Sequence, residues 1–275
     1  MSLAFQIMFW PIVACLVLPG LLVYLGLHIV RREIIFVDLA LAQVSALGIC
    51  VCVMLGHEAR EIHTWLWSAG FTLVGAGIFA LTRGGKNQRV PQEALIGIVY
   101  VVAAALGILL LSRNPEGNEE LRRTLVGDVL LVRPGDILKT FVTYFVITVI
   151  HWVWRRQFFA LTFEPEGAKA QRMSLRWWDF LFYSLFGLVV TSFVQIGGVL
   201  LVFSYLIVPA VCANFLTESL ARRLVIGWSI ATAGSMVGLY VSYKLDLPTG
   251  AAIVCALGLA LILVSCLRWL RRAAP

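Results

Sequence analysis

Charged residues are scarce in this chain: they make up 13% of its 275 residues, about half the share usual in soluble proteins. Hydrophobic residues make up 60%, more than a soluble fold of this length can bury. The excess must face lipid, so the composition predicts a membrane protein with several spans. The net charge of +7 does not indicate nucleic-acid binding, because the basic residues flank apolar runs.

The common signatures of enzyme active sites are also absent. The chain has no G-x-x-x-x-G-K-[ST] phosphate loop, no H-E-x-x-H pair and no G-x-S-x-G elbow. His28 and His151 each stand alone in an apolar run, which favours packing over catalysis. The six cysteines lie in or beside apolar runs and are predicted to be small core residues. We therefore predict that the chain is not an enzyme, and that uphill transport would need a gradient or a partner.

Apolar runs recur along the chain at the spacing of membrane spans, each of which needs about 20 apolar residues. They predict an all-α, polytopic transmembrane helical bundle of about nine spans, within a range of eight to ten, in one domain over residues 1–275. No basic residue precedes Arg31, so the first run lacks the start of a secretory signal and is predicted to be a span. The predicted spans are 5–29, 34–56, 64–82, 93–112, 138–154, 177–193, 196–211, 224–243 and 250–267.

The basic residues between these runs predict the orientation. With the N-terminus outside, the inner connections hold fifteen Lys and Arg residues and the outer connections hold seven, which favours N-out, C-in. The outer connection 113–136 contains LRRTLVGDVLLV, which predicts a short amphipathic helix on the outer surface. The inner connection 155–176 predicts another short helix, ended by Pro165 and Gly167.

A distinctive segment, GGVLLVFSYLIVPAVCANFLTESLARRL, covers residues 197–224. Pro209 is expected to interrupt the span, because its ring clashes with the preceding turn and it lacks an N–H. A separate short helix would follow at the cytoplasmic surface, where it could meet another protein through Asn214, Thr217, Glu218 and Arg222. An ordinary turn between two helices is the alternative.

This segment resembles the signature of the integral-membrane permeases of zinc/manganese/iron ABC importers, in which G-x-L-L-V leads into I-I/V-P-A-x-x-A. The matching residues are Gly198, Leu200, Leu201, Val202, Pro209, Ala210 and Ala213. Four further stretches are similar to the same family in order along the chain: Glu93 with Ile96-Gly97-Ile98, LVGDVLLV at 125–132, FEPE at 163–166 and DLPTGA at 246–251.

The resemblance implies a homodimeric permease in the bacterial inner membrane that imports a divalent transition metal, zinc first and then manganese or iron. It implies a cytoplasmic ABC ATPase that docks on the coupling helix, and a periplasmic or lipid-anchored metal-binding protein at the outer face, near Asp128 and Asp246. The chain itself would bind no cofactor, since ATP and Mg²⁺ belong to the ATPase. The alternative is a secondary, ion-coupled transporter in which Asp38 relays protons.

The second predicted span departs from the family pattern F-x-G-D-A-L-S-H-A-x-x-P-G. Aligned through Gly48, Gln43 takes the histidine place, Leu39 takes the aspartate place and Leu47 replaces the proline. Asp38 is displaced by one residue, so it and Gln43 lie about 140° apart on a helix and cannot form one dyad.

Three interpretations of Asp38 remain open. It could line the pathway and offer a carboxylate to passing metal, it could pair with an arginine or cap a helix, or it could lie near the inner interface close to Arg32. Gln43 and Ser45 could line the same pathway or form hydrogen bonds between helices. The metal ligands proposed from the sequence within this span are Asp38 and Gln43.

The connection HEAREIH at 57–63 offers further ligands at the predicted outer mouth. His57 and His63, with Glu58 and Glu61 between them, could capture metal transiently. A solvated loop is the alternative.

Overall fold

The computed structural model describes residues 3–57, 62–82, 91–112, 117–127, 129–164, 167 and 173–273, and every regular element within them is a helix. The long helices are α1 (Leu3–Arg32), α2 (Val37–Met54), α3 (Ile62–Leu81), α4 (Gln92–Leu111), α6 (Pro134–Val153), α9 (Leu175–Leu216), α10 (Leu220–Leu245) and α11 (Thr249–Ala273). Two short helices, α5 (Gly117–Val126) and α7 (Arg155–Phe163), and the 3₁₀ turn η1 (Val129–Leu131) lie between them.

Eight of these helices are long and apolar enough to cross a membrane. Large apolar side chains remain exposed along their outer faces, such as Val101 on α4, Phe145 on α6 and Leu263 on α11. A surface of this kind is stable only against lipid, so the predicted polytopic all-α fold is confirmed. The predicted short helices of the two long connections are also present, as α5 and α7.

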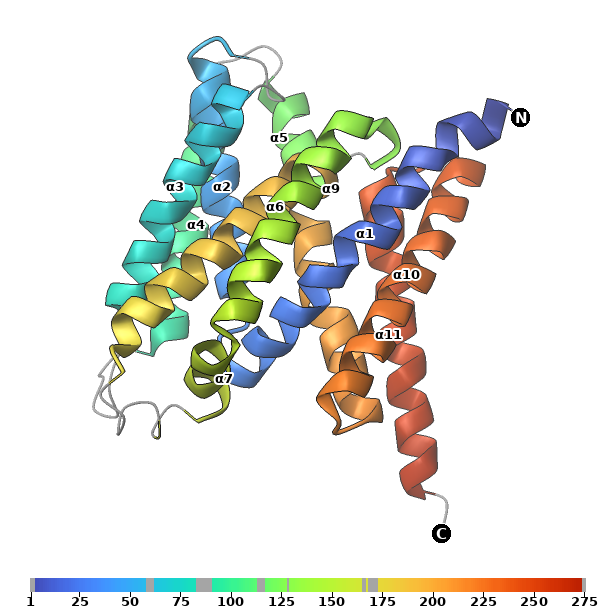
Figure 1. The fold of residues 1–275 in the computed structure, drawn as a ribbon. Coiled ribbons are helices and arrows are strands. Elements are labelled where there is room, and N and C mark those ends of the chain that lie inside the picture. Colours follow the sequence, from blue (N-terminus) through green and yellow to red (C-terminus); the bar gives the residue numbers. More distant parts are fainter. Residues whose placement is uncertain are drawn as a thin grey trace.

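Helix α9 accounts for the two predicted spans 177–193 and 196–211. A straight helix of its 42 residues would be about 63 Å long, twice the thickness of the hydrocarbon core. The backbone departs from helical geometry at Gly198, where φ is 72° and ψ is 171°. Figure 1 shows the first part of α9 rising toward the end where the N-terminus lies and the second part returning. Within its described residues the chain therefore crosses the bundle nine times, and its termini lie at opposite ends.

The predicted interruption at Pro209 is wrong. The second part of α9 continues through Pro209 to Leu216, and no separate short helix follows among the described residues before α10 begins at Leu220. Proline is tolerated inside a membrane helix where neighbouring helices support the local backbone. Here the Pro209 carbonyl faces Gly227 of α10, which has no side chain to obstruct the approach.

Glycines make the break in α9 possible. Gly127 and Gly198 both have positive φ, at 67° and 72°, and their backbones lie against each other. Gly250, at the start of α11, packs on the carbonyl of Val126 and near that of Gly197. We call these four residues, Gly127, Gly197, Gly198 and Gly250, the glycine junction. Three stretches that are distant in the sequence meet there backbone to backbone.

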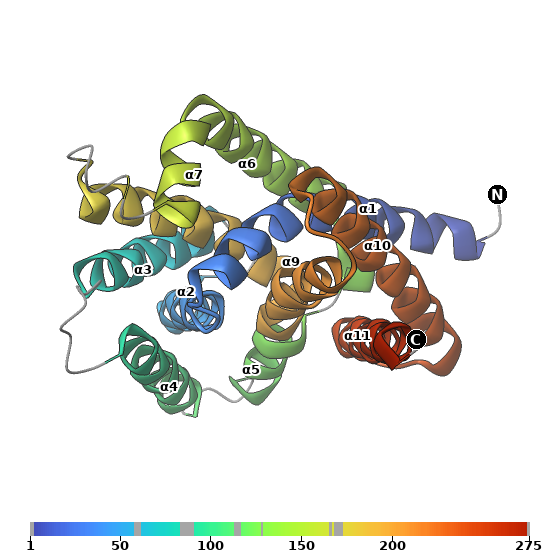
Figure 2. The ribbon, with the colours of Figure 1, turned by 90° about the horizontal axis from the view of Figure 1, so that it is seen from below.

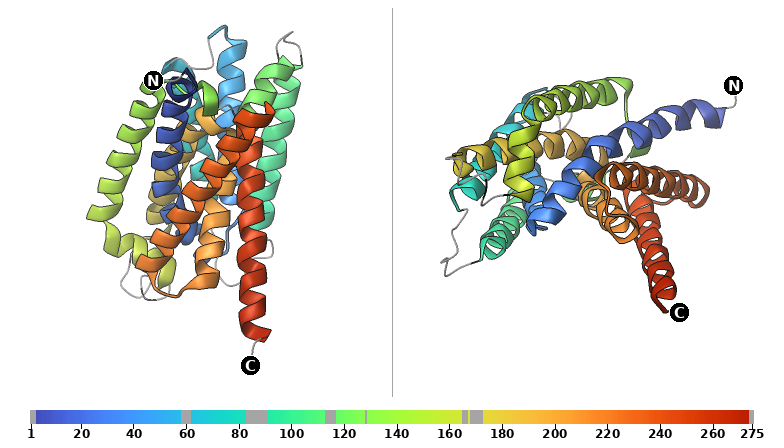
Figure 3. Two further views of the ribbon diagram at one scale, coloured as in Figure 1. Left: turned by 90° about the vertical axis from the view of Figure 1, so that its right-hand side faces the viewer. Right: turned by 60° about the horizontal axis from the view of Figure 1, so that its bottom comes forward.

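Helix α2 lies inside the bundle, between α3, α4 and α9 (Figure 2). Fourteen of its eighteen residues are buried, so most of its circumference contacts protein rather than lipid. Helix α11 lies at the edge instead, and its C-terminal part projects beyond the rest of the bundle (Figure 3). Any polar side chain on α2 is therefore enclosed by this chain alone.

Candidate transport pathway and coupling surface

Asp38 lies in the first turn of α2 and is completely buried. Its Oδ1 accepts a hydrogen bond of 2.7 Å from the backbone N–H of Leu39. Its Oδ2 has no hydrogen-bond partner among the described residues. A buried carboxylate oxygen without a donor is costly, which indicates a constraint other than stability at this position.

Gln43 presents a second buried oxygen on the same helix. Its side chain is 4% exposed, and its Oε1 also has no partner within the described part of the chain. Five helical residues separate Gln43 from Asp38, which places them about 140° apart around the axis and about 7.5 Å apart along it. They cannot hold one ion together. In the described residues no three His, Cys, Asp or Glu side chains converge on a possible metal position.

Ser45 joins α2 to α3. Its hydroxyl lies 2.7 Å from the Ser68 hydroxyl, and Ser68 Oγ donates to the Ser45 carbonyl at 2.9 Å. Gly48 allows this approach, because a Cβ at Gly48 would lie 2.7 Å from the Ser68 Cα. These contacts support the interhelical hydrogen-bonding interpretation of Ser45 over pathway lining.

An arginine–aspartate pair that the sequence does not predict lies near the end of α1 opposite to the N-terminus. Arg32 Nη1 lies 3.3 Å from Asp179 Oδ1, with side chains 8% and 0% exposed. Arg32 Nε donates to Thr162 Oγ1 at 3.0 Å, and its guanidinium lies 3.8 Å from the centre of the Phe182 ring. Arg32 thus links α1 to α7 and to the first part of α9. The arginine that Asp38 could have paired with contacts Asp179 instead.

The two isolated histidines lie near this pair, and the rings of both contact Tyr24 and Phe182. His28 Nδ1 lies 2.8 Å from Thr162 Oγ1. His151 Nδ1 donates to the Ile147 carbonyl at 3.0 Å, and its ring stacks on Phe158 at 4.3 Å. The predicted packing role of both histidines is therefore confirmed. The sequence does not predict that they lie close together, because 123 residues separate them.

His57 and His63 approach each other at the predicted outer mouth. Their ring centroids are 5.2 Å apart and both side chains are exposed. Glu58 and Glu61, the other two candidate ligands of this connection, lie outside the described residues. Two exposed imidazoles at this distance can approach a common ion after small side-chain rotations, so transient metal capture stays a prediction.

The turn between α9 and α10 forms the predicted coupling surface. Glu218 and Arg222 are exposed there. Thr217 is half-buried, and its carbonyl accepts a hydrogen bond of 2.8 Å from Arg223 Nε, which holds the turn in place. Asn214 is partly buried, and its Oδ1 has no partner among the described residues. The charged groups of this turn are therefore available to another protein.

Two acidic residues, Asp128 and Asp246, are predicted for the outer face. Asp128 lies outside the described residues. Asp246 is exposed and ends α10 in the left-handed conformation, with φ of 53°. Asparagine and aspartate tolerate this conformation better than most residues, so Asp246 has a local structural role at this turn.

Comparison with known proteins identifies the family. The ABC 3 transport family model matches residues 4–268. The chain is 28% identical over 232 residues to the manganese transport system membrane protein MntC of Listeria monocytogenes, covering 84% of this chain and 79% of that protein. It is also 28% identical over 207 residues to a probable iron transport system membrane protein of Haemophilus influenzae, covering 73% and 76%.

The fold has a close counterpart among solved structures. PsaBC from Streptococcus pneumoniae, solved in complex with Fab, superposes with a TM-score of 0.79 at 23% identity, covering 94% of this chain and 91% of that one. The chain belongs to the ABC 3 transport family, and it is a multi-pass bacterial membrane permease subunit rather than an enzyme.

Proposed function

We propose that this chain is the permease subunit of an ATP-driven importer of divalent transition-metal ions, with manganese as its preferred cargo. The similar proteins from Listeria and Haemophilus are described as manganese and iron systems. Zinc, ranked first from the sequence, has no such specific support. The proposed assembly is a homodimer with a cytoplasmic ATPase, which binds ATP and Mg²⁺, and an extracytoplasmic metal-binding protein.

Two buried oxygens on α2, Asp38 Oδ2 and Gln43 Oε1, have no partner in the described part of the chain, and we infer the preferred metal from them. Carboxylate and carbonyl oxygens suit Mn²⁺, whereas zinc favours imidazole and thiolate ligands. A glutamine in the family's histidine place therefore shifts the ligand set toward oxygen. Because the two groups cannot hold one ion together, they would act as successive contacts for a moving ion.

Asp38→Asn is expected to lower manganese uptake about tenfold in proteoliposomes that contain the complete transporter, since the charge of one ligand is lost. Gln43→His is expected to raise the ratio of zinc to manganese uptake by a similar factor. Ser45→Ala, on the same buried helix, is the matched control and should leave that ratio unchanged. Equal metal ratios in wild type and Gln43→His would contradict the proposed role of Gln43.

Coupling to the ATPase is proposed at the α9–α10 turn. Reversing both charges, Glu218→Arg with Arg222→Glu, should abolish metal-stimulated ATP hydrolysis, because the exposed groups would then repel their partners across the interface. Reversing Glu119 and Arg122 on α5, which are also exposed, serves as the control. If the α9–α10 variant kept the metal-stimulated ATP hydrolysis of the wild type, the coupling contact would have to lie elsewhere.

The secondary-transporter alternative makes a different prediction. It requires no partner, so the permease alone in liposomes would accumulate metal when an ion gradient is applied. We expect no accumulation until the ATPase and ATP are added.

A further inference from the structure

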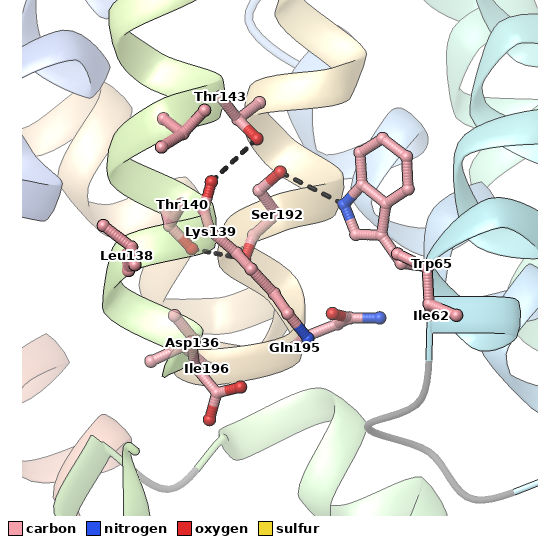
Figure 4. Close-up of a pocket in the computed structure, with 11 residues that line it drawn as sticks. Ile62, Trp65, Asp136, Leu138, Lys139, Thr140, Thr143, Ser192, Gln195 and Ile196 are labelled. Atoms are coloured by element: carbon pink, nitrogen blue, oxygen red, sulfur yellow. Dashed lines mark hydrogen bonds between the residues drawn. The ribbon is translucent and has the colours of Figure 1, made fainter. Parts of the chain in front are cut away.

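A cavity of about 400 Å³ opens between the beginnings of α3 and α6 and the end of the first part of α9 (Figure 4). It lies outside the proposed metal pathway on α2. Its apolar lining residues are Ile62, Leu138, Val142 and Ile196. Its other lining residues are Asp136, Lys139, Thr140, Thr143, Ser192, Gln195 and Trp65.

Most polar groups of the cavity already have hydrogen bonds. Trp65 Nε1 donates to Ser192 Oγ at 3.3 Å, Thr143 Oγ1 donates to the Lys139 carbonyl at 3.0 Å, and Asp136 Oδ2 accepts from the Arg133 N–H at 3.2 Å. These bonds hold the walls in place without occupying the space between them.

Two hydrogen-bond donors of the cavity are left over. Gln195 Nε2 is buried and has no partner among the described residues. The Lys139 ammonium makes no ion pair within the described part of the chain. Figure 4 shows both side chains extending into the space between α6 and α3. An ammonium and an amide N–H₂ together match an anionic oxygen group.

The cavity also lies near the beginning of α6, where a helix that spans the bilayer passes from the headgroups to the acyl chains. Lys139 is five residues into α6, about 7.5 Å from its beginning along the axis. Lysine and tryptophan side chains are typical of this boundary. Leu138 and Val142 on the same helix are 63% and 52% exposed, so the apolar wall continues into the lipid-facing surface of α6.

We propose that this cavity binds one anionic phospholipid of the bilayer. Its phosphate contacts Lys139 and Gln195, and an acyl chain lies along Leu138 and Val142. A free phosphate ion would accept hydrogen bonds from the two donors but leave the apolar side chains of the cavity uncovered. A lipid supplies both a phosphate for the donors and an acyl chain for the apolar side chains. The lipid would bridge α3, α6 and the first part of α9.

Native mass spectrometry of the delipidated full chain, titrated with phosphatidylglycerol, tests this proposal. We expect one retained phosphatidylglycerol per chain, bound about tenfold more tightly than phosphatidylcholine. Lys139→Gln should weaken that lipid about tenfold. Lys244→Gln is the matched control, because Lys244 is an exposed lysine in the last turn of α10, near the same end of the bundle.

A second variant keeps the charge and fills the space. Thr143→Phe places a ring in the cavity and should also remove the tightly bound lipid. Equal lipid retention in wild type, Lys139→Gln and Thr143→Phe would overturn the proposal, and so would equal weakening by Lys244→Gln. Displacement of the lipid by inorganic phosphate at millimolar concentration would overturn it as well. None of these outcomes depends on metal transport.

Discussion

Replacing Gly198 by alanine is expected to destabilise the permease by roughly 3 kcal/mol or more, since a non-glycine residue at positive φ alone costs about 1–3 kcal/mol. Gly198 has φ of 72°, and a Cβ there would lie 2.7 Å from the Leu125 carbonyl oxygen and still closer to the Gly127 nitrogen. Both obstacles are backbone atoms, which cannot rotate away as a side chain can. The two parts of α9 would therefore be forced apart where the chain reverses direction.

The measurement is the thermal unfolding midpoint of the purified permease in detergent, where a loss of this size lowers Tm by roughly 6–12 °C. Gly258→Ala is the matched control, because Gly258 lies inside helix α11 with nothing within 4 Å of a Cβ. That change should leave Tm unchanged or raise it, since alanine has a higher helix propensity than glycine. Equal Tm values for Gly198→Ala and wild type would show that the junction can relax.

Much of this architecture could be predicted from the sequence, because lipid imposes strong rules on it. Every long apolar run became a helix, and the spacing of 177–193 and 196–211 correctly indicated two crossings. The motif glycines at 127, 198 and 250 were visible as separate matches. That these three glycines pack against one another could not be predicted, since only the folded chain shows that all three meet at the glycine junction.

The interruption predicted at Pro209 is wrong for a physical reason. Proline breaks helices in water, but inside this bundle the second part of α9 continues through Pro209 to Leu216. The chain reverses at Gly198 instead, where close backbone contact requires glycine and is not encoded by local propensity. The same limit applies to Asp38, whose burial and unpartnered Oδ2 depend on three surrounding helices.

The pair between Arg32 and Asp179 could not be predicted from the sequence either. Arg32 lies in a predicted polar connection, where it supports the predicted orientation, and Asp179 lies near the edge of a predicted span. A buried arginine in a membrane bundle calls for a carboxylate partner, but 147 residues separate the two and only the packing of α1 on α9 joins them.

Arg32→Met is expected to destabilise the permease by about 3–5 kcal/mol, because it removes the guanidinium that lies 3.3 Å from the buried Asp179 carboxylate. Asp179 is completely buried, and Arg32 also donates to Thr162 on α7. The loss should therefore weaken the attachment of α7 to α1, which then depends on the bond between His28 and Thr162, and expose the α7 chain to cleavage. Limited proteolysis around residues 155–163 and the unfolding midpoint in detergent would both report it.

The double variant Arg32→Met with Asp179→Leu distinguishes an uncompensated charge from a general packing defect. Replacing both members of a buried ion pair by apolar residues is often neutral, so the double variant should recover most of the stability that either single variant loses. Glu119→Gln is the surface control, since its ion pair with Arg122 is exposed and contributes little. If the double variant were no more stable than Arg32→Met, the pair would matter through its shape and its bond to Thr162 rather than through charge. Recovery would show instead that the stability of this end of the bundle depends on neutralising one buried carboxylate.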